Sequence, residues 1–444
     1  MDTPPAQEVA EAPHEDVLYQ RKGIKILGVQ LPPWRSPLAQ GSFMILTGFV
    51  CFLCPGMFNA LSGLGAGGQV DSTVQSNANV ALYTTFAFVG FTAGTVLNYF
   101  GAQATLAFGG LGYAMYSASF LCYNHTKNEG FVLFAGAFLG VCAGLLWCAQ
   151  GTVMMSYPTE NEKGRYIGLF WAIFNMGATN WDTPNHGSVK DGTYVGFLVL
   201  MLCGAVLAFF LVPPEKIIRK DGTRVQRIRH PSMTQICGLW ETIKTDTYIL
   251  LLFPFFWASN WFYTYQQNCY QLFYFNLRGR TFTNLWYWLA QIFGALIFGF
   301  FLDNQRIGRR KRAIYGWVIL FVAINSICPT NNLTGKDFTW YLILYMMWQT
   351  YAYWMMGALS NEPRKLAYFA GFYKGIQSAG AAVVWRLDAA KYSYASLFGS
   401  SWGLCGAGMI LAIPVIWRRI KDTEITEEDF VTPAEKDIVM SEVK

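Results

Sequence analysis

The dominant pattern along this chain is a series of long apolar runs separated by short polar segments. Most runs are about as long as a bilayer core is thick, and two shorter ones fill the gaps between them. Runs of this length with so little charge predict membrane-spanning helices rather than the core of a soluble domain. About twelve spans are expected, at 41–61, 78–100, 104–123, 131–156, 166–179, 193–212, 247–267, 283–302, 313–329, 338–359, 367–386 and 395–417.

The composition agrees with that pattern. The chain is 53% hydrophobic and 14% charged, whereas about a quarter of the residues in a soluble domain are charged. We therefore expect an all-α, multi-pass integral membrane protein whose first partner is the lipid bilayer. The choice between plasma membrane and endomembrane stays open.

Lysine and arginine positions indicate how the chain is threaded. With the N-terminus inside, cytoplasmic segments hold 25 of the 33 basic residues and outer segments hold 6, as the positive-inside rule requires. Both termini are therefore expected in the cytoplasm. The net charge of +6 then reflects topology, and no nucleic-acid partner is expected. Two glycosylation sequons, at Asn124 and Asn332, fall in predicted outer loops.

No residue pattern indicates catalysis. The four histidines form no metal-like cluster, the ten cysteines lie mostly in apolar runs, and there is no glycine-rich phosphate loop. The sequence therefore predicts a protein that is not an enzyme and that needs no metal and no cofactor.

The chain contains an internal repeat. A shift of 205 residues aligns Gly94 with Gly299, and a shift of 203 aligns Gly168 with Gly371, so span two matches span eight and span five matches span eleven. Two six-helix halves in the same order are expected. The predicted divisions are a tail (1–40), a first half (41–212), a basic linker (213–246), a second half (247–417) and a second tail (418–444).

The loop GFFLDNQRIGRRKR resembles the signature loop of the major facilitator superfamily. That resemblance implies a conformational latch formed by Gly299, Asp303, Gly308, Arg309 and Arg310, in which the acid bonds to neighbouring helix ends. The match is partial, because the spacing from Asp303 to Gly308 is two residues longer than the pattern and the first-half copy, GTVLNYFGAQ, has no basic residue. An ordinary positive-inside loop is the alternative.

Other segments resemble the fungal branch of the uncoordinated-ninety-three-like family, a divergent arm of that superfamily. They are CFLCPGMFNALSGLGAGG, LLWCAQGTVMMSYPTENEKGRYIGLFWAIFNMG, FFWASNWFYTYQ, WQTYAYWMMGAL and AYFAGFYKGIQSAGAAVVWRLD. The resemblance covers nearly the whole chain and implies a major-facilitator-type fold. Animal members are described as an ion channel regulator and as an escort for membrane receptors, and fungal members are regarded as transporters because of their fold.

Span five is unusually short. YIGLFWAIFNMGAT is apolar for 14 residues, about 21 Å of helix against a core of roughly 30 Å, and the chain then turns to NWDTPNHGSVKDG. Two explanations stay open. A piece of helix five is missing from this chain, or the polar segment with Pro184 completes the crossing. We favour the missing piece, because Asp182 at lipid depth would cost a few kcal/mol.

Candidate solute-path residues come from the spans that line the cavity in the resembled fold. Their side chains hydrogen-bond or stack, and buried residues of this kind also commonly join helices. They are Asn59, Gln150, Asn260, Tyr265, Gln266, Gln349 and Tyr353, together with Lys374 and Gln377 of span eleven.

Lys374 is the one cation well inside a predicted span, and Trp171 occupies the corresponding position of the first repeat. Helical spacing places Gln377 and Ser378 on its face, so the face is expected to meet protein or a cavity. A lysine at the bilayer centre costs about 2.5 to 3.5 kcal/mol and often marks a solute or ion path. Alternatively its stem reaches back towards cytoplasmic water.

Two hypotheses for function follow. The first is a secondary transporter that moves a small polar or anionic solute by rocking its two halves around Lys374. The second is a non-transporting protein that regulates or escorts a membrane-protein partner, as the animal relatives suggest. A continuous cavity that reaches Lys374 would favour the first hypothesis, and tight packing around it would favour the second.

Overall fold

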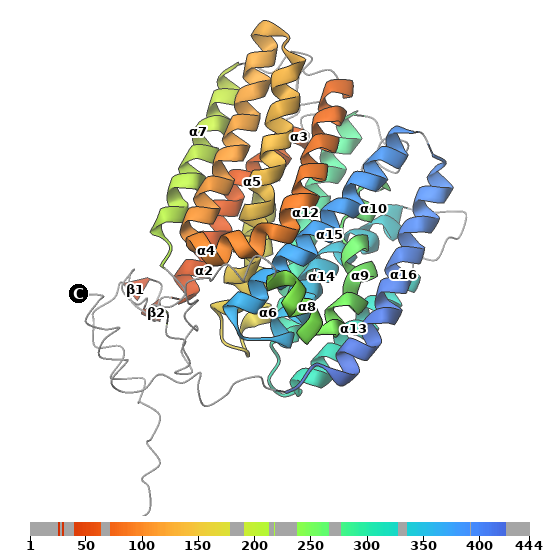
Figure 1. Ribbon diagram of the computed structural model, residues 1–444. Helices are drawn as coiled ribbons and strands as arrows, with labels where there is room; N and C mark the ends of the chain where they lie inside the picture. Colours follow the sequence, from red (N-terminus) through yellow and green to blue (C-terminus); the bar gives the residue numbers. More distant parts are fainter. Residues whose placement is uncertain are drawn as a thin grey trace, which may run out of the picture.

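The computed structural model describes residues 25–26, 29–30, 40–63, 72–177, 191–212, 217, 238–265, 277–326, 335–390 and 392–422. Helices dominate this part of the chain and run roughly side by side in two groups (Figure 1). A strand pair precedes them, in which β1 (Lys25–Ile26) runs antiparallel to β2 (Val29–Gln30). The predicted tails and linker lie largely outside the described residues.

The first group of helices covers the predicted first half. It consists of α2 (Gln40–Cys51), the π-helix η1 (Phe52–Gly56), α3 (Met57–Gly63), α4 (Ser72–Thr126), α5 (Glu129–Ser156), α6 (Lys163–Met176), α7 (Asp191–Leu207) and the 3-10 helix η3 (Ala208–Phe210). The π-helix contains Pro55, and proline removes a backbone donor, which fits a break in the regular helical register at this point.

The second group covers the predicted linker end and second half. It consists of α8 (Gly238–Thr245), the 3-10 helix η6 (Thr247–Leu252), α9 (Phe253–Ala258), α10 (Trp261–Thr264), α12 (Leu277–Leu302), α13 (Arg309–Ser326), α14 (Gly335–Leu359), α15 (Pro363–Ala389) and α16 (Tyr394–Arg418). Helical structure therefore coincides with most of every predicted span.

Five described helices are long and apolar enough to be candidate membrane spans by length and composition alone. The figure of twelve crossings stays a prediction. Spans two and three both lie within α4 and are separated by a break in helical geometry at the single residue Gly101. Gly101 has φ 80° and ψ 167°, a region of backbone space that is essentially open only to glycine.

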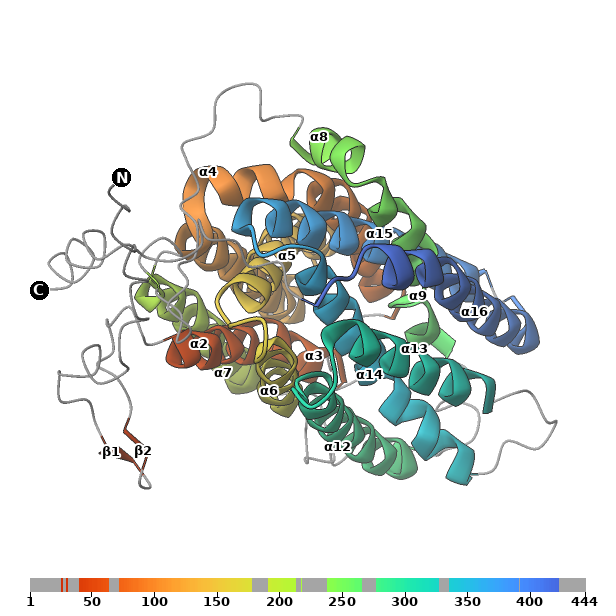
Figure 2. The same ribbon diagram turned by 90° about the horizontal axis from the view of Figure 1, so that it is seen from below.

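The two halves meet along two helix pairs, α4 with α15 and α6 with α12, which lie side by side in Figure 2. Glycines allow the close approach. A Cβ at Gly90 would lie 2.6 Å from the Cα of Gly375, and a Cβ at Gly164 would lie 2.6 Å from the carbonyl oxygen of Gly299. Small residues at such interfaces let helix backbones touch, which favours packing in a membrane.

The repeat is visible in these contacts. Gly94 of α4 packs on Tyr368 and Ala367 of α15, while its repeat partner Gly299 of α12 packs on α6. Corresponding glycines of the two halves therefore occupy corresponding interfaces, as expected if the halves are related by a pseudo-twofold axis.

Helix α6 is short, as the sequence predicted. It has 14 residues, whereas its partner α12 has 26. The segment that would continue it, 178–190 with Asp182 and Pro184, lies outside the described residues.

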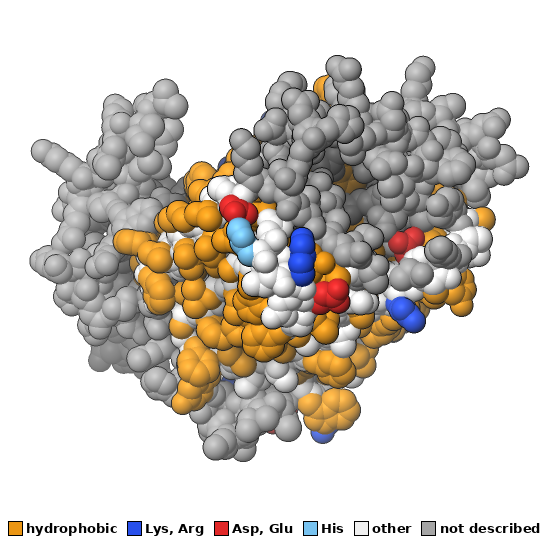
Figure 3. Space-filling model, turned by 90° about the horizontal axis from the view of Figure 1, so that it is seen from above, with side chains coloured by type: hydrophobic (Ala, Val, Ile, Leu, Met, Phe, Trp, Pro, Cys, Tyr) orange, Lys and Arg blue, Asp and Glu red, His pale blue; other side chains and the backbone are white. Residues whose placement is uncertain are grey.

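Seen from above, the described surface is mainly apolar with few charged side chains (Figure 3). The opposite end carries α8 and the start of α13 (Figure 1). We call that opposite end the cytoplasmic end, after the predicted topology.

Candidate functional site

Lys374 lies at the centre of the bundle, on α15, with 4% of its surface exposed. Its ammonium donates a hydrogen bond to Oε1 of Gln377 at 2.7 Å. Gln377 and Ser378 of the same helix face are also buried, so this face meets protein as predicted. The lysine stem does not carry its charge back to water.

Four aromatic rings surround the ammonium of Lys374. The distances from Nζ to the ring centroids are 4.4 Å for Trp147, 5.0 Å for Tyr373, 5.5 Å for Tyr353 and 5.9 Å for Trp171. Electron-rich ring faces attract a cation at such distances, and more strongly where water is excluded. We call these four rings the aromatic cage.

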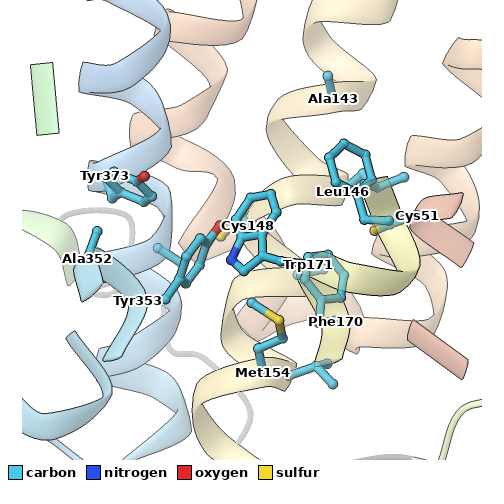
Figure 4. Packing of buried hydrophobic residues seen from close by; sticks show 14 of the residues in the cluster. Cys51, Ala143, Leu146, Cys148, Met154, Phe170, Trp171, Ala352, Tyr353 and Tyr373 are labelled. Carbon is cyan, nitrogen blue, oxygen red and sulfur yellow. The ribbon is translucent and has the colours of Figure 1, made fainter. Parts of the chain in front are cut away.

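The cage is built across the boundary between the halves. The two tryptophans come from α5 and α6 of the first half, and the two tyrosines from α14 and α15 of the second. Figure 4 shows Tyr353 and Tyr373 facing Trp171 from the opposite set of helices. The contact of Lys374 with Trp147 and Trp171 therefore links the two halves at mid-depth.

Packing and hydrogen bonds hold the cage rings in place. Trp147 stacks on Trp171 with centroids 6.0 Å apart, and its indole donates to Tyr113 Oη at 3.1 Å. Tyr353 donates to Oε1 of Gln150 at 3.2 Å. Contacts within the protein therefore orient the rings of Trp147, Trp171 and Tyr353.

Hydrogen bonds extend from Gln377 through the second half. Its amide nitrogen donates to Oδ1 of Asn260 at 3.0 Å and to Tyr373 Oη at 3.3 Å. Tyr373 donates to Oε1 of Gln349, whose amide nitrogen donates to the carbonyl of Ser259 at 2.9 Å. Lys374 is thus anchored by neutral groups.

Two donors beside the cage have no described acceptor. The amide nitrogen of Gln150 and the indole nitrogen of Trp171 are both buried and donate to no described residue. The Trp171 nitrogen points towards Tyr353 (Figure 4). Buried donors are normally paired, so unpaired ones next to a cation favour an additional acceptor at this place. No carboxylate among the described residues forms an ion pair with Lys374.

A second set of polar contacts joins the two halves at the cytoplasmic end. Asp303, one residue beyond α12, accepts hydrogen bonds from the backbone nitrogens of Gly164, at 2.7 Å, and Arg165. It therefore caps the start of α6 in the other half, where free N–H groups favour an acceptor. Burial raises the pKa of Asp303 to about 7, although these N–H groups and the nearby arginines oppose the rise.

Beside Asp303 lies a buried group that we call the cytoplasmic network, formed by Glu160, Lys163, Arg309, Gly357 and Asn361. The Glu160 carboxylate accepts from Arg309 at 2.8 Å and from Asn361 at 2.7 Å. Lys163 donates to the Gly357 carbonyl at 2.7 Å and to Asn361 at 2.8 Å. Glu160 and Lys163 come from the first half and Arg309 from the second, so the network joins the halves.

The structure brings most predicted solute-path residues together. Lys374, Gln377, Gln150, Asn260, Gln349 and Tyr353 belong to one connected region around the cage. Tyr265 instead packs at a tilt against Phe398 with ring centroids 5.2 Å apart, and Asn59 is half-buried on α3. Gln266 lies outside the described residues.

The predicted latch residues gather at the cytoplasmic end. Gly299 packs on Gly164, Asp303 caps α6, and Arg309 joins the network. Gly308 approaches Asp422, and Arg310 donates to the Trp417 carbonyl at 2.6 Å.

The two glycosylation candidates differ in what the structure describes. Asn124 lies in the last turns of α4 with its amide nitrogen buried, so a glycan there requires this helix end to move. Asn332 lies outside the described residues.

Sequence reasoning missed several members of both sites. Trp171 and Tyr373 were absent from the candidate set, and so were Glu160 and Lys163. The repeat offered one usable signal, because it placed Trp171 at the position equivalent to Lys374, and equivalent positions on inner helices face each other across a pseudo-twofold axis.

Solved structures place the arrangement in a known fold class. The Escherichia coli fucose:proton symporter FucP, in its outward conformation, matches with a TM-score of 0.62 at 12% identity over 84% of this chain and 97% of that one. The human organic anion transporter MFSD10 matches with a TM-score of 0.62 at 12% identity, over 86% of this chain and 99% of that one. The protein is a multi-pass integral membrane protein with the major facilitator superfamily fold.

Sequence comparisons give the family. The model of the ion channel regulatory protein UNC-93 matches residues 76–331. An UNC93-like protein of Schizosaccharomyces pombe is 46% identical over 437 residues, covering 89% of this chain and 86% of that protein. UNC93-like protein 1 of Arabidopsis thaliana is 40% identical over 427 residues, covering 88% and 92%. This chain belongs to the UNC-93 family, which confirms the resemblance of its motifs.

Proposed function

We propose that this protein is a secondary transporter that moves a small polar or anionic solute by alternating access, with the central site as its solute site. The observation that carries the proposal is the Lys374 ammonium, buried between the halves without a described carboxylate partner. The unpaired donors of Gln150 and Trp171 beside it favour an anionic or polar acceptor.

The latch and the cytoplasmic network support a rocking cycle. Asp303, Arg309 and Lys163 join the two halves through contacts that can break and re-form, whereas the glycine contacts allow the helices to pivot. We assign this arrangement to the state that is closed towards the cytoplasm.

Transport is tested with purified protein in liposomes. A screen of labelled polar and anionic solutes identifies one that is taken up, and Lys374→Ala is then expected to abolish its uptake. Asn124→Gln and Asn332→Gln, at the glycosylation candidates, should leave uptake unchanged. Unchanged uptake in Lys374→Ala would remove Lys374 from the mechanism.

A second candidate function is regulation or escort of another membrane protein. The tight packing of four rings around Lys374 favours it, and the UNC-93 family model is named for ion channel regulation. Recovery of a stoichiometric membrane-protein partner on mild purification, combined with absence of uptake, would support this function over transport.

The membrane orientation is proposed with both termini in the cytoplasm. An epitope tag at either end should be protected from protease in intact cells and become accessible after permeabilisation. Protease access to one tag only, in intact cells, would require an odd number of crossings.

For helix five we propose that a piece is missing from this chain. The alignment with the S. pombe relative has 437 positions but covers 89% of 444 residues, about 395, so about 42 of its positions have no counterpart here. Transcript sequencing across codons 176–190 tests the proposal. A confirmed contiguous message would favour the polar segment as the end of the crossing.

A further inference from the structure

The central site holds its own cation in a setting that usually receives a ligand cation. Aromatic faces, rather than carboxylates, surround the Lys374 ammonium at 4.4 to 5.9 Å. Sets of rings of this kind favour weakly hydrated, alkylated ammonium groups. Lys374 therefore acts as a tethered occupant of a cage suited to such a group.

Two polar atoms beside the aromatic cage that lack a described partner are both donors. The Gln150 amide nitrogen and the Trp171 indole nitrogen are buried and unpaired among the described residues, and Lys374 itself can only donate. A carboxylate accepts hydrogen bonds through both oxygens and therefore matches donors of this kind. The site therefore offers one surface for a cation and one for an anion.

Charge balance decides between solute classes. An anion alone would draw Lys374 out of the cage and leave the ring faces empty, whereas a cation alone would meet the charge of Lys374. A zwitterion satisfies both parts, because its carboxylate can pair with Lys374 while its ammonium replaces that of Lys374 over the rings. The exchange leaves the net charge of the site unchanged.

We propose that the solute of this site is a small zwitterion carrying an alkylated ammonium and a carboxylate, with the carboxylate bound by Lys374, Gln150 and Trp171 and the ammonium taken by the aromatic cage. This inference rests on the proposed transport function, which provides the solute with access to the buried site. It adds to that function the chemical class of the solute.

Because the cage spans both halves, rocking can widen it. Trp147 and Trp171 move with the first half, and Lys374, Tyr353 and Tyr373 move with the second. The bulk of a trimethylammonium group can thus be admitted only when the halves separate at this level.

Three probes of nearly equal shape separate the classes. Glycine betaine carries both charges, 3,3-dimethylbutanoate replaces its nitrogen by carbon, and choline replaces the carboxylate by a hydroxymethyl group. Binding to the purified full chain is measured by isothermal titration calorimetry. We expect betaine to bind about tenfold or more tightly than either analogue, since each analogue loses one charged contact.

Three results would overturn the inference. Equal binding of 3,3-dimethylbutanoate would show that the cage does not recognise the ammonium, and equal binding of choline would show that the donors do not recognise the carboxylate. Failure of all three probes to bind protein that unfolds cooperatively would also overturn it.

Matched variants locate the two charges. Trp147→Leu should weaken betaine binding about tenfold, whereas Trp147→Phe keeps a ring and should retain most of the affinity. Lys374→Met should reverse the preference, so that choline binds at least as well as betaine. A Lys374→Met protein that still prefers betaine would contradict the assignment of the carboxylate.

Uptake distinguishes this inference from the proposed function. Betaine binding without uptake would refute transport while the binding inference stands. Uptake of anions without preference for zwitterions would refute the inference while transport stands.

Discussion

Cations are buried between the halves at two depths, and their surroundings differ. At the cytoplasmic end, Arg309 and Lys163 meet the carboxylate of Glu160, the amide of Asn361 and the carbonyl of Gly357. At the centre, Lys374 meets four rings and one amide oxygen. The first set includes a carboxylate of the protein itself, whereas no carboxylate among the described residues pairs with Lys374.

This difference suggests separate roles for the two places. The ion pair of Arg309 with Glu160 forms only when the halves are together, so it stabilises that conformation. A cation held by rings alone keeps much of its capacity to attract an anion, because ring faces are weaker partners than a carboxylate. The cytoplasmic network therefore stabilises one arrangement of the halves, whereas Lys374 can exchange its ring contacts for an anion.

The largest expected effect comes from breaking the cytoplasmic network. Arg309→Leu removes the guanidinium that pairs with the buried carboxylate of Glu160 and should destabilise the protein by about 3 to 5 kcal/mol. Thermal unfolding in detergent measures this loss. The double variant Glu160→Gln with Arg309→Leu should recover much of it, and no recovery would mean that the arginine acts through other contacts.

A smaller effect is expected where the helices touch. Gly299→Ala places a methyl group against the backbone of Gly164 and should destabilise the protein by about 1 to 3 kcal/mol. Gly399→Ala is the control, because a Cβ there meets nothing within 4 Å. Equal melting temperatures for the two variants would show that the contact of α6 with α12 is loose.

The cap of α6 predicts a pH dependence. The pKa of Asp303 is about 7 in the folded protein against an ordinary 3.8, so the folded state keeps a proton that the unfolded chain loses near pH 4. Its contribution to stability should therefore decline as pH rises from about 4 to about 7 and then level off.

Melting curves between pH 5 and 8 test this dependence. The stability of the wild type relative to Asp303→Asn should fall over that range. Asp422→Asn, at an exposed acid of the same end, is the matched control. A constant difference between wild type and Asp303→Asn would contradict the raised pKa.

The smallest change in stability is expected at the centre. Lys374→Leu removes cation–π contacts, but it also removes the cost of burying an unpaired charge, so stability should change by about 1 kcal/mol or less. Uptake should nevertheless be lost. If Lys374→Leu lowered the free energy of unfolding by several kcal/mol, Lys374 would have a structural role rather than a binding role.

The sequence was sufficient for the fold class and for most helix positions. Apolar run lengths located the helices, and the repeat identified glycines such as Gly94 and Gly299 that later proved to lie between the halves. The lysine was found because a charge inside an apolar run stands out, and Asp303 because it lies in a recognisable loop.

The cage and the cytoplasmic network could not be found in the same way. Trp147 and Trp171 look like ordinary apolar residues of their spans, and Glu160 and Lys163 look like ordinary loop charges. Their roles depend on which helices of the opposite half approach them, and that approach depends on tertiary packing across about 200 residues of sequence. Helical periodicity reports the face of a helix but not the partner opposite that face.

The connection between spans two and three is much shorter than its counterpart in the second half. The helical backbone of the first half breaks at the single residue Gly101, whereas six residues, 303–308, separate α12 from α13 in the second half. A one-residue connection leaves no loop positions for basic side chains. The difference in connection length therefore accounts for the absence of Lys and Arg from the first-half copy, GTVLNYFGAQ.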